Sequence, residues 1–401
     1  MSASEYARYR RELANFKLAK ADDQDPTKAG ANRAGHISFP TRAQPSTPAF
    51  LQRFIRYIPD ETIFAYERVI NIIGVGEGGG GTVTTNPLTT QTTPSAGAID
   101  SAGNIYWANR GSAGTSSVRR LNASTNDITD LIAPATAIGG VVLNNPTGIT
   151  RDSAGNMAIT DRLNNRLLYY SVVPTTTLYG VSCAQNAWTV ILSSAGGVSN
   201  PQQLSFAPNG DIYWADFNSE KIKRISKSSG TVADIMGNVP QCRTVYVDSA
   251  GNIFIVSGTG FLFMLPVVAG RYFGKNLPAA PVGSIAFNAE DSYMIASGFD
   301  PFIYGAVTDS FRNLYFNHQT NRQIMKLDFN TGAVTVVAGS GNSGFQPGSV
   351  PIASATFGPN AVGLFIDSAD NLYVCDGGGG NFSIRKIPYE NTKVVRPGRW
   401  E

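Results

Sequence analysis

The sequence predicts an all-β fold: a six-bladed β-propeller closed by an N-terminal strand and preceded by a partly helical N-terminal arm. Three observations predict it: a short motif that recurs six times, apolar segments on both sides of each copy, and a composition suited to short strands and tight turns. The chain has 42 glycines and 22 prolines, and only 15% of its residues are charged. A repeat-built β fold of 401 residues can enclose a single closed core.

The arm is expected over residues 1–67. Residues 2–20 are predicted to form an amphipathic helix, residues 21–48 an extended linker, and residues 48–58 a second short helix. The arm cannot bury both apolar stripes by itself, so we expect them to bind the propeller's own flank, a neighbouring subunit or an anionic membrane. The predicted partner-binding residues are Tyr6, Tyr9, Leu13, Phe16, Phe50, Leu51, Phe54 and Ile55.

The propeller is expected over residues 68–390, and its repeated motif reads Asp-Ser-Ala-Gly-Asn at Asp100 to Asn104. Aspartate suits the first position of a type I turn, and glycine suits the fourth, where positive φ costs it little. Arg312 and Asp370 replace the glycine in two copies and Ala207 replaces the aspartate in another, so these turns are expected to differ slightly. A half-exposed third strand and a fourth strand follow each hairpin, which makes one antiparallel blade per copy.

The last unit ends after its third predicted strand, so its fourth must come from elsewhere. Residues 69–76 resemble residues 334–341, the fourth strand of the fifth unit. We therefore predict that residues 68–73 form the outermost strand of the last blade, with residues 391–401 as a C-terminal tail.

An insertion is expected around residues 266–300. Within it, residues 284–287 and 293–296 are candidates for a further hairpin, and a degenerate seventh blade stays open as an alternative. The apolar segment at residues 261–265 stands where a half-exposed strand is expected, so either the insertion or a partner protein should cover it.

One stretch carries a family resemblance. Residues 355–359, followed by Asp367, residues 371–374 and Asp376, resemble the signature of the NHL repeat. The resemblance covers residues 68–388 and implies a propeller. NHL-like proteins include protein-binding scaffolds, RNA-binding modules and a few metal-dependent lyases or hydrolases, so function must be argued from sites.

Polar residues are predicted where the second strands end, on the face opposite the turns and beside the entry to the central channel. They could bind a metal or a polar substrate, or they could cap loops, as Asp and Asn side chains commonly do. The chain has only two histidines, His36 and His318, which excludes a multi-histidine zinc site, whereas a carboxylate-bound calcium ion stays open. We predict no catalytic residue, no metal site and no cofactor. The candidate ligand-binding residues are Asn109, Asp161, Asp216, His318 and Asp376.

The functional expectation is a non-catalytic, protein-binding or structural propeller, anchored by its arm in a larger assembly such as a virion or another shell. Protein partners would bind the arm and the propeller loops. Residues 71–401 carry equal numbers of basic and acidic side chains, so there is no strong nucleic-acid signal. No signal peptide or transmembrane segment is predicted, which suggests a cytoplasmic protein or a component of a large particle. The alternative is a calcium-type, metal-dependent lyase or hydrolase acting at the channel mouth.

Overall fold

The computed structural model describes residues 61–66, 68–73, 93–281, 283–286, 292–299, 302–344, 349–360, 362–378 and 381–394. It divides into two units, one of residues 63–392 and one of residues 1–62 with 393–401. The predicted helices at residues 2–20 and 48–58 and the linker between them lie outside the described residues. The described helices are three single 3-10 turns: η1 (Arg162–Asn164), η2 (Ser194–Gly196) and η3 (Ile352–Ser354).

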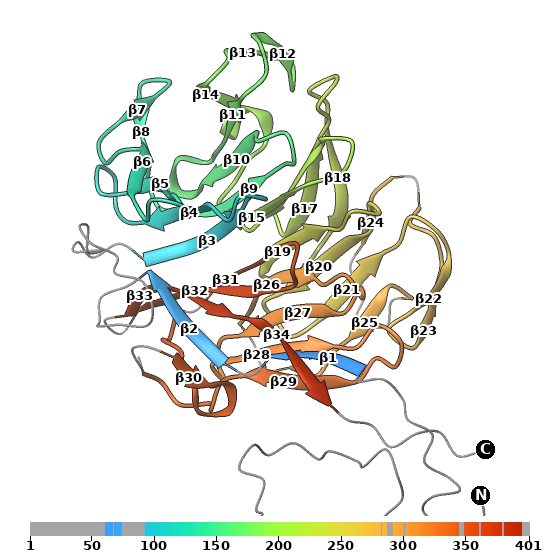
Figure 1. Cartoon of the computed structure of the whole chain (residues 1–401). Coiled ribbons are helices and arrows are strands. Elements are labelled where there is room, and N and C mark those ends of the chain that lie inside the picture. The colour runs from blue at the N-terminus through green and yellow to red at the C-terminus, as the bar shows by residue number, and fades with distance from the viewer. Residues whose placement is uncertain are drawn as a thin grey trace, which may run out of the picture. The chain divides into compact units, whose positions relative to one another are not determined.

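Residues 63–392 form the predicted six-bladed β-propeller (Figure 1). Each blade is an antiparallel meander in which consecutive strands pair from the innermost strand outwards. The first three blades are β3 (Thr93–Ile99), β4 (Ile105–Arg110), β5 (Ser117–Leu121) and β6 (Ile128–Ile132); β9 (Pro146–Arg151), β10 (Met157–Asp161), β11 (Arg166–Ser171) and β14 (Ala187–Leu192); and β15 (Pro201–Phe206), β16 (Ile212–Asp216), β17 (Lys221–Ile225) and β18 (Val232–Gly237).

The remaining blades follow the same order, although two of them complete their sheets with strands from elsewhere in the chain. They are β19 (Cys242–Val247), β20 (Ile253–Ser257), β21 (Leu262–Leu265) and β25 (Met294–Ala296); β26 (Ile303–Thr308), β27 (Leu314–His318), β28 (Gln323–Leu327) and β29 (Val334–Ala338); and β31 (Gly363–Ile366), β32 (Leu372–Gly378), β33 (Asn381–Ile387) and β2 (Arg68–Ile73).

The innermost strands form a closed ring. Each lies against the innermost strand of the next blade, from β3 through β9, β15, β19, β26 and β31, and β31 returns to β3. Six separate hydrophobic clusters lie between the blades, one at each interface. Because both faces of each sheet are covered in this way, the second strands read as almost continuous apolar runs, and Trp107 and Trp214 on two of them are fully buried.

The closing strand lies where the sequence predicted it. In β2, Ile70 pairs with Lys386 and Ile73 pairs with Ile384 of β33, so an early segment completes the last blade. One detail of the prediction was wrong, because β2 is not the outermost strand. A three-residue strand, β30 (Ser349–Pro351), pairs antiparallel with the outer edge of β2. A separate two-stranded sheet joins β1 (Glu61–Tyr66), in the predicted arm, to β34 (Tyr389–Val394), which begins at the end of the predicted propeller and continues into the predicted tail.

The repeated turns owe their shape to the Asp–Asn pair of the motif. In the first blade, Asp100 Oδ1 accepts hydrogen bonds from the backbone N–H groups of Ala102 and Asn104, and Oδ2 accepts one from Asn104 Nδ2 at 2.9 Å. Asn104 Oδ1 then accepts the N–H of Ala123, which ties this turn to the loop between β5 and β6. The same Asp–Asn pairing recurs in the second, fourth, fifth and sixth blades.

The substituted turns keep the backbone shape of the others, contrary to expectation for two of them. Arg312 and Asp370 take φ of 69° and 62°, in the same left-handed region as Gly103 at 82°. In the third blade, where Ala207 stands in place of aspartate, Asp211 occupies the asparagine position and accepts the N–H of Lys227 at 2.8 Å. The surrounding hydrogen bonds therefore hold the turn even where the residue type is unfavourable.

The described residues of the insertion after β21 complete neighbouring sheets and form no extra blade. The expected hairpin of residues 284–287 and 293–296 is wrong: β24 (Ile285–Ala286) pairs parallel with β18, while β25 pairs antiparallel with β21. All four residues of β21 are buried, packed against Tyr293 on one face and Phe273 on the other, so the insertion covers this apolar strand. Short hairpins account for the other additions: β7 (Ala137–Ile138) with β8 (Val141–Val142), β12 (Thr176–Leu178) with β13 (Val181–Cys183), and β22 (Gly270–Tyr272) with β23 (Lys275–Leu277).

No helix among the described residues is long and apolar enough to span a membrane.

Candidate ligand site at the channel mouth

The antiparallel meander fixes which residues share a face. The innermost strands begin, and the second strands end, on the face opposite the Asp–Asn turns. We call this the mouth face. It carries all five sequence-predicted ligand residues, each within two residues of the end of a second strand and each almost completely buried.

Asp161 at the end of β10 is occupied by the loops around it. Its Oδ1 accepts the N–H of Asn144 at 2.8 Å, and its Oδ2 accepts hydrogen bonds from Arg166 Nε and Asn164 Nδ2, both at 2.7 Å. Arg166 is held in turn by the carbonyls of Ile138 and Val141. Asp161 thus neutralises a buried guanidinium and fixes the loop that leads into β9.

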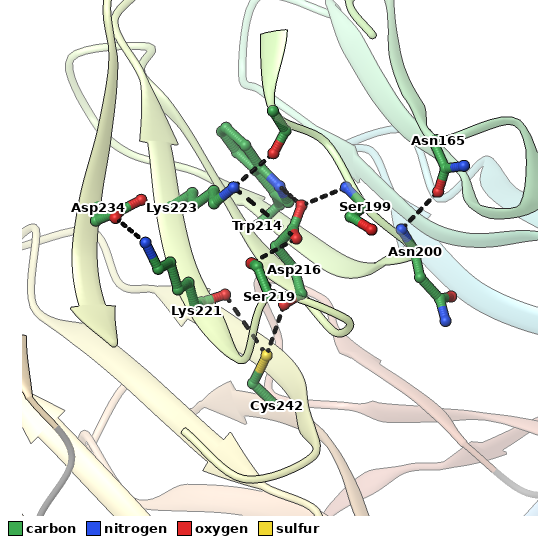
Figure 2. Close-up of polar contacts among 11 residues, drawn as sticks. Asn165, Ser199, Asn200, Trp214, Asp216, Ser219, Lys221, Lys223, Asp234 and Cys242 are labelled. Carbon is green, nitrogen blue, oxygen red and sulfur yellow. Dashed lines mark hydrogen bonds and ion pairs between the residues drawn. The ribbon is translucent and has the colours of Figure 1, made fainter. Parts of the chain in front are cut away.

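Asp216 has the same role in the third blade, as Figure 2 shows. Its Oδ2 accepts the N–H of Ser199 at 2.8 Å and the indole N–H of Trp214 at 3.0 Å, while its Oδ1 accepts a hydrogen bond from Ser219 at 2.6 Å. Lys223 Nζ lies 3.9 Å from the same carboxylate. The carboxylate therefore holds the loop before β15, as Asp161 holds the loop before β9.

The other predicted residues also contact their own loops. Asp376 Oδ1 accepts the N–H of Gly358 at 2.6 Å, and Oδ2 lies 3.3 Å from Arg385, whose guanidinium stacks on the Phe357 ring at 5.0 Å. His318 Nδ1 accepts the N–H of Asn321 at 3.2 Å. Asn109 Nδ2 donates to Ser117 Oγ at 3.4 Å.

These five residues share a face, but the structure does not bring them into one cluster. Among the described side chains, no group of three or more His, Cys, Asp or Glu residues is close enough to hold a metal ion. Asp161, Asp216 and Asp376 belong to three different blades, and each already contacts a cation of its own: Arg166, Lys223 and Arg385.

A cavity of about 210 Å³ lies in the channel, in the half that leads to the turns. All six innermost strands line it, mostly with apolar side chains and backbone. The Gln203 side chain connects three innermost strands here, because its amide donates to the carbonyl of Thr147 at 2.8 Å and to that of Ser95 at 3.4 Å. The predicted mouth residues do not line this cavity.

The mouth face also carries an arginine cluster that sequence reasoning missed. Arg243 on β19 places its guanidinium 4.9 Å from the ring centre of Tyr304 on β26 and 4.8 Å from that of Phe217. Both strands have an irregular register here, between Cys242 and Thr244 and between Tyr304 and Ala306. A β-bulge turns side chains out of their regular alternation, and bulges are common beside functional sites.

Two more arginines complete the cluster. Arg110 ends β4, and Arg162 follows β10, where its Nε donates to Asn200 Oδ1 at 2.6 Å. Burial, reinforced by repulsion from Arg162, lowers the pKa of Arg110, and burial with repulsion from Arg243 lowers the pKa of Arg162. Burial raises the pKa of the Tyr304 phenol, although all three guanidinium groups oppose this shift. We define the arginine cluster as Arg110, Arg162, Arg243 and Tyr304.

The described residues form no ion pair with the arginine cluster. The signal in the sequence was weak, because basic and acidic residues balance over the propeller. Arg110 and Arg162 do, however, directly follow Asn109 and Asp161, the positions already predicted for this face.

Comparison with known proteins supports the fold and no narrower assignment. No family model matches the chain, and no curated protein matches it. An auxiliary nutrient binding protein from Bacteroides thetaiotaomicron superposes with a TM-score of 0.55 at 14% identity, covering 82% of this chain and 77% of that one. Its counterpart from Bacteroides ovatus gives 0.51 at 14% identity, with the same coverage. An inactive virginiamycin B lyase from Staphylococcus aureus, crystallised with quinupristin, gives 0.46 at 12% identity over 76% of this chain and 87% of that one.

Proposed function

We propose that this chain is a non-catalytic binding propeller of the NHL type, held in a larger assembly by its N-terminal arm. The proposal rests on the contacts that the carboxylates at the mouth face already make. Asp161, Asp216 and Asp376 each accept a backbone N–H from a neighbouring loop, and each contacts a cation. Carboxylates committed in this way hold loops in place and are poorly suited to proton transfer.

Exposed apolar side chains on the propeller give the proposal further support. Val334 and Val336 alternate along β29, the outer strand of the fifth blade, with 39% and 50% of their surfaces exposed. Residues two apart on a strand point to the same side, so these two form one small apolar patch. A binding protein can use such a patch for a partner, in addition to the two apolar stripes predicted for the arm.

Deleting residues 1–60 tests the anchoring role. The deletion leaves β1, β2 and every blade in place, so the product should fold as a soluble monomer that no longer enters the complex. Native mass spectrometry of the complex from the source, made with the full chain and with the shortened chain, measures this. A complex of unchanged mass and stoichiometry that still contains the shortened chain would contradict the proposal.

The alternative of a calcium-dependent lyase or hydrolase gains no specific support, since the three aspartates are spread over three blades. Metal analysis of the purified protein addresses it directly. One equivalent of calcium, lost when Asp161, Asp216 and Asp376 are changed together to Asn, would favour the enzyme over the binding propeller.

A further inference from the structure

We propose that the arginine cluster binds a polyvalent oxyanion, the phosphate or sulfate group of a small ligand, at the mouth of the channel. This site differs from the arm-mediated contacts proposed above and uses only residues of the propeller.

The side chains of the arginine cluster converge from several blades. The cluster draws on the first, second, fourth and fifth blades, and the third blade links them through Asn200 and Phe217. Asn200 accepts the Arg162 hydrogen bond, its carbonyl accepts the N–H of Phe217, and the Phe217 ring lies under Arg243. Side chains held by several rigid sheets keep a fixed arrangement, which lowers the entropic cost of binding.

The positive charge of the cluster also favours an anionic ligand. Three guanidinium groups that repel one another, with no carboxylate paired to them in the described residues, are unfavourable in the absence of a ligand. An anion between them would remove this repulsion. The strain is the kind of local cost that a fold retains at a binding site.

The cluster also supplies hydrogen-bond donors for an oxyanion. Among the described residues, the buried Nε of Arg243 has no hydrogen-bond partner, and none bonds to the Tyr304 hydroxyl. Another nitrogen of the same guanidinium, Nη2, donates to Gln241 Oε1 at 3.4 Å. Planar guanidinium groups bind oxyanions through two parallel hydrogen bonds, whereas a lysine ammonium acts as a point charge. Stacking on Phe217 and Tyr304 fixes the plane of Arg243, so its donors are already oriented.

The channel and the charge distribution limit the size of the ligand. Further along the channel, the Gln203 side chain bonds to the carbonyls of Thr147 and Ser95, and the cavity there is about 210 Å³, which favours a small ligand. The charge balance over the propeller also provides no extended basic track for a nucleic-acid backbone. A compact ligand with two or more negative charges fits both observations.

The test uses the full chain, with inorganic phosphate, pyrophosphate and sulfate as separate probes at constant ionic strength and chloride as the background anion. Calorimetric titration measures affinity, and thermal unfolding measures stabilisation by each probe. We expect binding to the wild-type protein and at least tenfold weaker binding to Arg110→Gln. The matched control is Arg271→Gln, an exposed arginine on β22 outside the cluster, which should bind as the wild type does.

Arg110→Gln also separates a binding role from a structural one. Arg110 makes no side-chain hydrogen bond or ion pair with the described residues, so its replacement should leave the melting temperature without probe equal or higher. Arg243→Lys, which keeps the charge but loses the planar fork, should bind more weakly than the wild type and more strongly than Arg243→Gln. Preference for pyrophosphate over sulfate, or the reverse, identifies which oxyanion the site accepts.

Two results would overturn the proposal: no binding of any probe to the wild-type protein at millimolar concentration, or binding that persists when Arg110, Arg162 and Arg243 are all changed to Gln. Neither depends on residues 1–60. Failure of the anchoring proposal would therefore leave this one standing, and the reverse also holds.

Discussion

At the residue scale, the aspartate found in five of the six repeats does more than begin a turn. Asp309 in the fifth blade accepts the N–H groups of Phe311 and Asn313 through Oδ1, and the side chains of Asn313 and Tyr315 through Oδ2. One buried carboxylate thus connects a turn, the first residues after it and a core tyrosine.

We expect Asp309→Ala to lower the free energy of unfolding by about 1–3 kcal/mol, because buried donors lose their acceptor. Urea denaturation checks this. Asp309→Asn keeps an acceptor oxygen for the backbone and should lose less. An Ala variant as stable as the wild type would show that the pairing is incidental.

The backbone favours glycine at the fourth turn position. Gly103 has φ of 82°, and a Cβ there would lie 3.3 Å from Ala123 Cβ. Gly103→Ala should therefore cost about 1–2 kcal/mol. Gly237 is the control, since nothing lies within 4 Å of an added Cβ and its φ is not positive. Gly237→Ala should be neutral or slightly stabilising, and equal losses at the two sites would contradict this reasoning.

The three cysteines, Cys183, Cys242 and Cys375, are buried and free. Burial, with the nearby Asp216 carboxylate, raises the pKa of Cys242 to about 12, and burial also raises the pKa of Cys183 and Cys375. A raised pKa keeps the thiols protonated at pH 8, and thiolate is the reactive form. A chromogenic thiol reagent at pH 8 should react with the native protein far more slowly than with the unfolded chain, where three equivalents should react at once. Rapid labelling of the native protein would show that the thiols are accessible.

At the element scale, a structural feature could be predicted where neighbouring residues, or a similar segment elsewhere in the chain, indicate it. The turns and β2 could be predicted because Asp-Gly-Asn chemistry is local and because the segment at 69–76 has a counterpart within the chain. The pairing of β24 with β18 could not, since a two-residue parallel pairing leaves no periodicity. The arginine cluster was missed for a related reason: Arg243 reaches the mouth through a register irregularity that is absent from the residue pattern.

The closing strand makes a truncation experiment decisive. Removing residues 1–67 keeps β2, whereas removing residues 1–74 deletes it and leaves the outer edges of β33 and β30 unpaired. We expect the shorter deletion to stay soluble and the longer one to melt at a lower temperature and to aggregate, because exposed strand edges template association. Thermal unfolding and size-exclusion chromatography measure both effects. Identical behaviour would mean that β2 is dispensable.

At the scale of the whole molecule, no blade has a core of its own. Each of the six clusters is shared by two neighbours, so unfolding one blade exposes apolar surface on the next. We expect the propeller to unfold in one transition. Trp107, Trp188 and Trp214 lie on the first three blades, so tryptophan fluorescence reports mainly on that half, whereas far-ultraviolet circular dichroism averages over all strands. Coincident midpoints are expected, and an earlier fluorescence transition would show that the halves unfold separately.

The pairing of Ile73 with Ile384 also governs how the protein is made in the cell. The segment that becomes β2 leaves the ribosome well before its partner strand has been synthesised. At a synthesis rate of about 5–20 residues per second, it stays without that partner for roughly 15–60 s. During this interval the apolar segment of β2 has no partner strand in the nascent chain. Chaperones that shield emerging polypeptides should therefore have their largest effect on yield before the last blade is translated.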